Sequence, residues 1–241
     1  MTEQRIVRRD EGGLATLTLN RPDKLNALDT QAFEELDAHL AELERQTETI
    51  GCVVLRGAGR GFCAGADLGS IAAATVSFKP KVIDRLGRLP QPTVAAVHGV
   101  CFTGALELAL ACDFILADRT ARFADTHGKW GLVGAWGMIQ RLPRRIGMPA
   151  AKTMMLTART VGAEEAKALG LADQLGDDLD ALLGEFTGQI LANSWHTNLH
   201  TKRILRETEG MELAHALAHE AYTYPGYAPD YPERVAAFTK K

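Results

Sequence analysis

Apolar and polar positions near the start of the chain follow two different spacings. Residues 14–19 alternate with a period of two, which is typical of a strand that buries one face. Further along, Asp29 or Thr30 can cap a helix. The apolar residues of that helix recur at helical spacing and are Phe33, Leu36, Leu40 and Leu43. The pattern therefore predicts a strand, a loop and a helix, in that order.

The same alternation of strand and helix continues through the middle of the chain. Apolar runs predict strands at 53–55, 94–97 and 114–117. Helices are predicted near 105–112, 136–142 and 163–169. Strands that alternate with helices in this way are typical of an α/β fold with β-α crossovers.

The pattern changes at about Asp178. Beyond it no strand-like alternation is found, and residues 179–192 and 211–222 favour helix. We therefore expect a core domain at 1–177 and a C-terminal helical segment at 178–241.

Composition narrows the class of protein. A chain of 241 residues with 46% hydrophobic content can bury a full core, and a net charge of −3 with mixed signs argues against a nucleic-acid binder. The N-terminal residues are charged where a secretory signal would be apolar, and the longest apolar run, 92–117, contains Glu107 and Asp113. We expect a cytoplasmic protein that does not cross a membrane, with its four isolated cysteines buried and reduced.

Two glycine-rich turns each follow an apolar, strand-like run. They are GCVVLRGAGRGFCAGAD at 51–67 and HGVCFTGALELALACD at 98–113. Glycines let the main chain turn where a side chain would obstruct it, which leaves backbone N–H groups free to hold an anion. In the second segment Glu107 is the one charged residue of an apolar stretch, and it falls in the first turn of the predicted helix.

At these residues the chain resembles the crotonase (enoyl-CoA hydratase/isomerase) superfamily. The resemblance also covers LTLNRPDKLNALD at 17–29, MMLTARTVGAEEAKALGLAD at 154–173 and ERVAAF at 233–238. It implies an α/β fold, a crotonase-like ββα superhelix with a C-terminal helical segment. It also implies a homotrimer or a dimer of trimers, and the apolar spacing of residues 182–190 and 213–222 is compatible with that assembly.

The resemblance implies an acyl-CoA thioester as substrate, with coenzyme A as part of that substrate and no permanently bound cofactor. The thioester oxygen would be held by the backbone N–H groups of Ala64 and Gly104, and Glu107 would be the catalytic glutamate. A carboxylate in an apolar helix turn is partly desolvated, which raises its pKa and favours proton transfer. The alternative for Glu107 is a structural cap of its own helix.

The chain departs from the hydratases of the family at one position. Where they carry a second glutamate, this sequence has His127, with Asp125 nearby. Histidine can replace an acid or a base, and a carboxylate such as Asp125 or Glu107 would fix its tautomer. The alternative is a polar loop residue that bonds to the backbone.

For coenzyme A, the resemblance points to the backbone around Lys24 and Leu25 and to the AGAD turn, which comprises Ala64, Gly65, Ala66 and Asp67. Basic residues that could contact phosphate are Lys202, Lys240 and Lys241. No metal site is expected, because the histidine pairs at 196/200 and 215/219 lack a third ligand.

Trp130 and Trp136 could shape the acyl pocket or belong to the core. The segment between Asp67 and Gln91 is the expected variable wall of that pocket.

We therefore expect an enoyl-CoA hydratase-like lyase that adds water to an acyl-CoA thioester, or removes it, through an enolate in an oxyanion hole. Another enolate reaction of the family, such as isomerisation, decarboxylation or C–C hydrolysis, is the first alternative. A non-catalytic acyl-CoA binder is the second.

Overall fold

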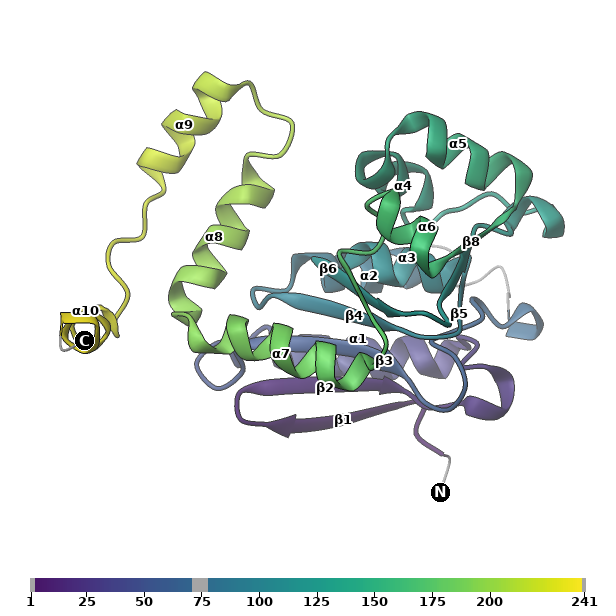
Figure 1. The fold of residues 1–241 in the computed structure, drawn as a ribbon, viewed down its shortest axis with the longest axis horizontal. Helices are drawn as coiled ribbons and strands as arrows, with labels where there is room; N and C mark the ends of the chain where they lie inside the picture. The colour runs from purple at the N-terminus through teal and green to yellow at the C-terminus, as the bar shows by residue number, and fades with distance from the viewer. Residues whose placement is uncertain (1–2, 71–77, 240–241) are drawn as a thin grey trace.

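The computed structural model describes residues 3–70 and 78–239, and it combines two sheets with helices on both sides (Figure 1). The strands are β1 Ile6–Glu11, β2 Leu14–Leu19, β3 Cys52–Gly57, β4 Thr93–Val97, β5 Val100–Phe102, β6 Phe114–Asp118, β7 Arg122–Ala124, β8 Thr160–Gly162 and β9 Gln174–Gly176. The α-helices are α1 Thr30–Leu43, α2 Phe78–Arg88, α3 Gly104–Ala111, α4 Met138–Ile146, α5 Met148–Thr157, α6 Ala163–Ala168, α7 Leu179–Ala192, α8 Trp195–Glu207, α9 Leu213–Tyr222 and α10 Tyr231–Thr239. Short 3-10 helices include η1 Pro22–Lys24, η2 Leu68–Ser70 and η4 His127–Trp130.

The larger sheet has six strands in the order β1-β2-β3-β4-β6-β9. β1 and β2 form an antiparallel hairpin, and the pairs from β2 onward are parallel. A smaller sheet has the order β5-β7-β8. β3 and β4 are parallel, so the loops that follow them emerge at the same edge of the sheet. These two loops are the glycine-rich turns.

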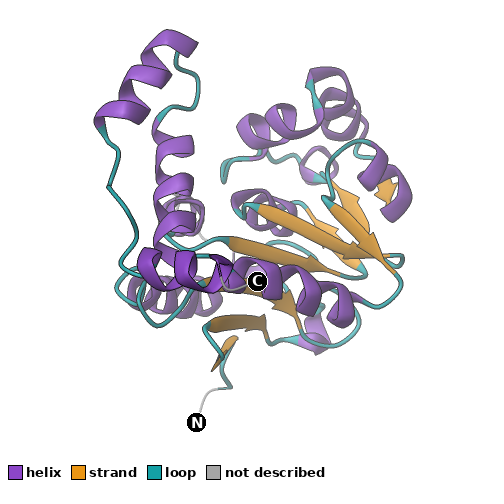
Figure 2. Cartoon of the chain, turned by 60° about the vertical axis from the view of Figure 1, so that its left-hand side comes forward, coloured by secondary structure: helices purple, strands orange, loops and turns teal. Residues whose placement is uncertain are grey.

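The central strands are buried on both faces, as parallel strands covered by helices usually are. Val53 and Leu55 belong to the core that α1, α2 and α3 cover, whereas Cys52 and Val54 belong to a second core under α7. Figure 2 shows this layering, with the sheet between helices. The four cysteines are free and buried, as expected.

Helices α8 to α10, which we call the C-terminal arm, extend away from the sheet (Figure 1). Several of its apolar side chains are exposed, among them Leu213, Leu217 and Tyr222. The expected segment boundary at 178 falls just before α7, but Leu182, Phe186 and Ile190 of α7 pack on the sheet of this same chain. α7 is therefore part of the core layer, and α8 is joined to the core through Lys202 and Arg206. Within the described ranges, no helix is both long and apolar enough to cross a membrane.

The strands and helices expected from hydrophobic spacing are confirmed with small shifts at their ends. Asp29 is the N-cap of α1, and its side chain accepts a hydrogen bond from the Ala32 N–H. α4 begins at Met138, two residues after the start that the sequence suggested. The short strands β5, β7, β8 and β9 have only three residues each, which is too short for a pattern of alternation to identify them.

Candidate active site

The two glycine-rich turns lie side by side beyond the ends of β3 and β4. The Phe62 N–H donates to the His98 carbonyl at 2.7 Å, and the Cys63 N–H donates to the Val100 carbonyl at 2.9 Å. In the opposite direction, the Phe102 N–H donates to the Cys63 carbonyl at 3.2 Å. These bonds hold the AGAD turn against the start of α3.

The N–H groups of the AGAD turn point in two directions. Ala64 and Asp67 donate to the carbonyls of Leu25 and Leu28, both at 2.9 Å, so these two groups hold the segment 25–28 in place. The Ala64 N–H that the sequence singled out is therefore occupied within the fold. In the described part of the chain the N–H of Ala66 has no acceptor, so the free donor of this turn is Ala66 and not Ala64.

The free N–H of Ala66 lies close to that of Gly104. A Cβ added to Gly104 would be 3.4 Å from the Ala66 nitrogen, and one added to Gly65 would be 3.5 Å from the Gly104 nitrogen. Gly104 is the first residue of α3, where an N–H group has no partner within the helix. Gly65 has φ 107°, and a Cβ there would be 2.7 Å from the Phe102 carbonyl oxygen, so the turn requires glycine.

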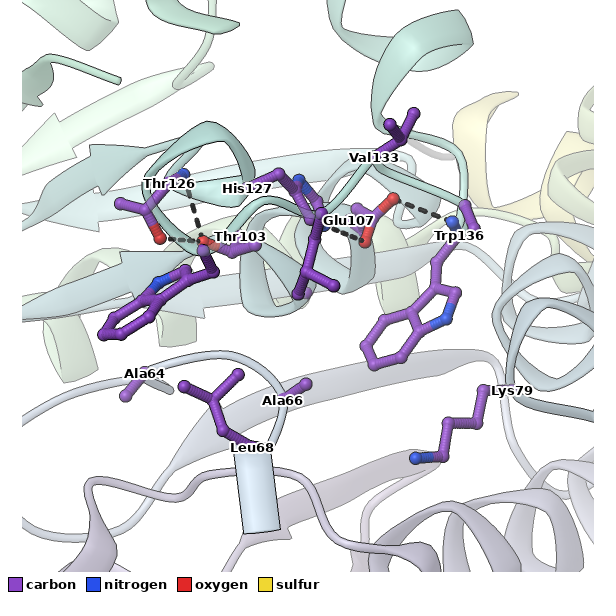
Figure 3. Close-up of a pocket in the computed structure, with 14 residues that line it drawn as sticks. Ala64, Ala66, Leu68, Lys79, Thr103, Glu107, Thr126, His127, Val133 and Trp136 are labelled. Atoms are coloured by element: carbon purple, nitrogen blue, oxygen red, sulfur yellow. Dashed lines mark hydrogen bonds and ion pairs between the residues drawn. The ribbon is translucent and has the colours of Figure 1, made fainter. Parts of the chain in front are cut away.

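Thr103, immediately before α3, adopts a conformation that usually belongs to glycine, with φ 55° and ψ −112°. Its N–H donates to the Ala124 carbonyl at 2.8 Å. Its hydroxyl accepts from the Thr126 N–H at 3.1 Å and lies 2.5 Å from the Thr126 hydroxyl (Figure 3). Three contacts therefore hold a strained residue next to Gly104.

A cavity of about 460 Å³ opens in front of these turns. Its lining is largely apolar and includes Ala66, Leu68, Leu132 and Val133. Trp130 and Trp136 both line it, and both alternatives hold for Trp136, which also packs against the core. Trp136 also packs edge-on against Phe33, with ring centroids 5.0 Å apart.

Glu107 of α3 reaches into this cavity from a buried position (Figure 3). Its Oε1 accepts hydrogen bonds from the Trp136 N–H at 2.8 Å and the Met138 N–H at 3.0 Å, so it does not cap its own helix. Its Oε2 is buried and has no hydrogen-bond partner among the described residues. Burial raises the pKa of Glu107, against the opposing effects of the Met138 N–H, the His127 charge and the Trp136 N–H.

His127 lies between two carboxylates. Its Nδ1 is 2.6 Å from Asp125 Oδ1, and its Nε2 is 3.7 Å from Glu107 Oε2. Burial lowers the pKa of His127, but the hydrogen bond to Asp125 and the charges of Asp125 and Glu107 outweigh burial, so the pKa is raised. Because Asp125 accepts the Nδ1 proton, Nε2 faces Glu107 and the cavity.

The residues expected to bind coenzyme A lie beside the site rather than within the cavity, except for Ala64 and Ala66. Lys24 ends η1, and Leu25 follows it with φ 49°. Asp67 is paired with Arg21 at 2.6 Å. The structure brings Lys24 and Leu25 next to the AGAD turn, and the contact of these residues with coenzyme A stays a prediction.

The basic residues expected to contact phosphate are placed differently. Lys202 is 2.6 Å from Asp113 and also donates to the Gln91 carbonyl at 2.8 Å, so its ammonium is engaged at the base of the C-terminal arm. Lys240 and Lys241 lie outside the described residues. Over 3–70 and 78–239, no group of three or more His, Cys, Asp and Glu side chains is arranged to hold a metal ion.

Sequence reasoning missed three features of this site. The role of Ala66 as free donor depends on which N–H groups the segment 25–28 takes up, and no motif carries that information. Thr103 could have been noticed from the sequence, because it is a threonine in a glycine-rich turn, directly before the helix that begins at Gly104. Lys79 also lines the cavity, from the variable segment where the sequence offered no pattern.

The family model described as enoyl-CoA hydratase/isomerase matches residues 9–224. The chain belongs to the enoyl-CoA hydratase/isomerase family. It is therefore a crotonase-family acyl-CoA enzyme, and its mixed α/β fold with two sheets and C-terminal helices matches the solved enoyl-CoA hydratases.

Some of the similar proteins are named hydratases and others isomerases. A probable peroxisomal enoyl-CoA hydratase of Arabidopsis thaliana is 34% identical over 89% of this chain and 83% of its own length. The 1,2-epoxyphenylacetyl-CoA isomerase of Escherichia coli is 34% identical over 96% of this chain and 94% of its own length. A crystal structure of an enoyl-CoA hydratase from Bacillus anthracis superimposes with a TM-score of 0.93 at 30% identity, covering 98% of this chain and 96% of that one.

Proposed function

We propose that this enzyme is an enoyl-CoA hydratase-like lyase, which adds water to the double bond of a 2-enoyl-CoA or removes it in the reverse direction. The observation that supports it is the pairing of Glu107 Oε2 and His127 Nε2, 3.7 Å apart in one cavity. Hydration needs one proton removed from water as its oxygen bonds to the β-carbon and one proton delivered to the α-carbon, and two titratable groups at this separation can serve both transfers.

The backbone donors would hold the thioester. When water adds to the β-carbon, the electrons of the double bond move toward the thioester and charge develops on its oxygen. The neighbouring free N–H groups of Ala66 and Gly104 would bind that single oxygen, and the N-terminus of α3 would add a favourable dipole at Gly104.

Glu107 would act as the base. Its Oε1 is fixed by two backbone N–H groups, so Oε2 is the oxygen left to take a proton from water as the water oxygen bonds to the β-carbon. Burial raises the pKa of Glu107, which makes its carboxylate a stronger proton acceptor than an exposed one.

His127 would supply the second proton. Its raised pKa favours the imidazolium form, and Nε2 can then donate to the α-carbon as the enolate collapses. One turnover leaves Glu107 protonated and His127 neutral. Transfer of that proton from Oε2 to Nε2 restores both groups for the next turnover.

Isomerisation of a double bond is the second candidate. It requires one group to remove a proton at one carbon and return it at another, and Glu107 has the free oxygen for both steps. Decarboxylation, C–C hydrolysis and catalytically silent binding are the remaining outcomes of the test below.

The deciding experiment offers enoyl-, malonyl- and β-diketo-CoA thioesters to the purified enzyme and follows absorbance and product mass. Loss of the enoyl absorbance with a gain of one water in mass supports hydration. A shift of the double bond without a mass change supports isomerisation. Loss of carbon dioxide, or cleavage of the diketone, supports the other enolate reactions, and binding without turnover of any of these thioesters contradicts the proposed lyase.

We also propose that coenzyme A enters as part of the substrate, along the backbone of Lys24 and Leu25 and the AGAD turn. The chain would assemble as a homotrimer or a dimer of trimers through the C-terminal arm, where Leu213, Leu217 and Tyr222 are exposed. Light scattering tests this assembly, and a stable monomer of 26.1 kDa at micromolar concentration would contradict it.

A further inference from the structure

Lys79, near the start of α2, forms part of the cavity wall. Only 5% of its surface is exposed. Figure 3 shows it across the cavity from Glu107 and His127, with its Nζ on the side of Ala66 and Leu68. A lysine is therefore buried at the end of the cavity away from the proposed proton-transfer groups.

The ammonium of Lys79 has two aromatic neighbours and no anionic partner. Its Nζ lies 5.6 Å from the ring centroid of Phe33 and 5.9 Å from that of Trp136. Among residues 3–70 and 78–239 it makes no hydrogen bond or ion pair. The rings favour a cation at this place, but they do not replace the hydrogen bonds that water would supply.

The acidic side chains whose charges reach Lys79 are already engaged by arginines. Asp29 is 3.0 Å from Arg5, and Asp67 is 2.6 Å from Arg21. Neither carboxylate is within ion-pair distance of the lysine. The protein therefore places a lysine ammonium at the cavity with no carboxylate of the described residues bound to it.

A buried charge without a partner is costly, whereas an apolar side chain in the same wall would pack without that cost. The neighbouring wall is indeed apolar, with Leu68, Leu132 and Val133. A cation retained there has the chemistry to bind an anion that enters the cavity. We propose Ala66 and Gly104 as the donors to the thioester oxygen, which leaves Lys79 available for an anionic group elsewhere in the substrate.

We propose that the natural substrate is an acyl-CoA whose acyl chain ends in a carboxylate, and that Lys79 binds this carboxylate at the far end of the cavity. The inference rests on the proposed function only in placing the acyl group in this cavity, and not on the reaction that follows. The aromatic rings of Phe33 and Trp136 position the ammonium, and the carboxylate supplies the missing partner.

The test compares the binding of saturated acyl-CoA pairs, which cannot be hydrated. Succinyl-, glutaryl- and adipyl-CoA are paired with butyryl-, pentanoyl- and hexanoyl-CoA, so that each pair differs in a terminal carboxylate against a methyl group at the same chain length. Titration calorimetry measures each affinity for the wild-type enzyme and for Lys79→Met. Lys81→Met is the matched control, because Lys81 lies on the same helix outside the cavity lining.

We expect the carboxylated member of at least one pair to bind ~10-fold or more tightly, as a charge-assisted hydrogen bond in a desolvated site allows. Lys79→Met should remove that preference and leave the methyl-ended partner bound equally well or better, while Lys81→Met should keep it. Equal affinity within every pair, or a preference that survives in Lys79→Met, would overturn the proposal.

The result of the Lys79 binding test can be distinguished from the result of the hydration test. An enzyme that hydrates a neutral enoyl-CoA but shows no carboxylate preference would contradict the role of Lys79 and leave hydration standing. A carboxylate preference without hydration of any enoyl-CoA would contradict hydration and leave Lys79 standing. Failure of every acyl-CoA to bind would overturn both.

Discussion

The cavity has a backbone half and a side-chain half, and the two are built by different means. The backbone half consists of the free N–H groups of Ala66 and Gly104, held in place by turns that need glycine at position 65. The side-chain half consists of Glu107 and His127, held by hydrogen bonds to their other polar atoms. The first half depends on main-chain conformation, and the second on chemical groups that can be exchanged singly.

This difference determines which substitutions are informative. A side-chain group can be replaced by an isostere that keeps the packing and removes the chemistry. A backbone donor can be removed only by proline, which also constrains the main chain, so it is better displaced through a neighbour. The predictions below concern four residues and use both routes, and the residues are ordered from the largest expected effect to the smallest.

Glu107→Gln should lower turnover by ~10²-fold or more, because general-base catalysis typically contributes that much. Glutamine keeps an oxygen for the Trp136 and Met138 N–H groups, so the cavity should keep its shape. Steady-state kinetics and acyl-CoA affinity measure the two effects separately. Wild-type turnover, or unfolding of the variant, would mean that the glutamate has a structural role only.

The same variant has a second readout in stability. Burial raises the pKa of Glu107 above its ordinary 4.5, so the folded enzyme holds this proton at pH values where the unfolded chain has lost it. The wild-type enzyme therefore loses stability as pH rises through that window, and Glu107→Gln does not. The difference in thermal unfolding temperature should grow in favour of the variant from acidic to neutral pH.

Gly65→Ala should lower turnover by about 10²-fold, because a Cβ placed 2.7 Å from the Phe102 carbonyl must move the turn that carries the Ala66 N–H. Kinetics and thermal unfolding are both measured. Gly12→Ala is the matched control, since Gly12 also has a positive φ, 58°, but open space around it. Gly12→Ala should cost stability alone, and an equal loss of rate in both variants would mean that strain rather than donor position matters.

His127→Ala should lower the rate at neutral pH by about tenfold, less than Glu107→Gln, because water can deliver a proton in place of the imidazolium. His127 must be protonated to act as the acid and its pKa is raised, so wild-type activity should fall on the alkaline side, above the ordinary value of 6.5. The variant should lose that limb of the pH–rate profile.

His127→Glu sharpens the same point. A gain in hydration of a short enoyl-CoA would mean that position 127 faces the α-carbon, as the second glutamate of the family's hydratases does. Unchanged kinetics in both His127 variants would leave Glu107 alone in the mechanism and favour isomerisation.

Thr103→Gly and Thr103→Val should each lower turnover by about threefold to fivefold, because both remove the hydroxyl that binds Thr126 next to Gly104. Their stabilities should differ. Glycine relieves the strain at φ 55°, which offsets the lost hydrogen bonds, whereas valine keeps the strain and loses the bonds. The thermal unfolding temperature should therefore be higher for the glycine variant than for the valine variant. The reverse order would mean that Thr103 is not strained.

The two halves also differ in how far the sequence predicted them. Glu107 and His127 could be placed by counting along the family's blocks, and the structure puts both in one cavity. The family resemblance points to Ala64 as the backbone donor, but the free N–H belongs to Ala66, two residues later. The sequence alone cannot distinguish one backbone N–H group of the turn from another. Only the hydrogen bond from Ala64 to Leu25, a contact distant in sequence, distinguishes it from Ala66.

The fold shows the same division. Long elements such as α1 and β4 follow from local spacing, with Asp29 capping α1 as expected. Three-residue strands such as β5 and β7 exist because the main chain pairs with a distant segment, and no local pattern marks them. Lys79 was missed for a related reason, since a single lysine in a variable segment gives no sign of which side of α2 is buried.

The buried thiol of Cys63 lies within the turn that carries Ala66. Its Sγ is 3.0 Å from the Asn26 carbonyl and 3.3 Å from the Gly65 nitrogen, and burial raises the pKa of this thiol to about 12. At neutral pH it is thus a protonated, inaccessible group, and an alkylating reagent can reach it only when the turn opens. The rate of Cys63 labelling consequently reports how often the turn that carries the Ala66 N–H opens in solution, and mass spectrometry of the labelled peptide can follow it without a substrate.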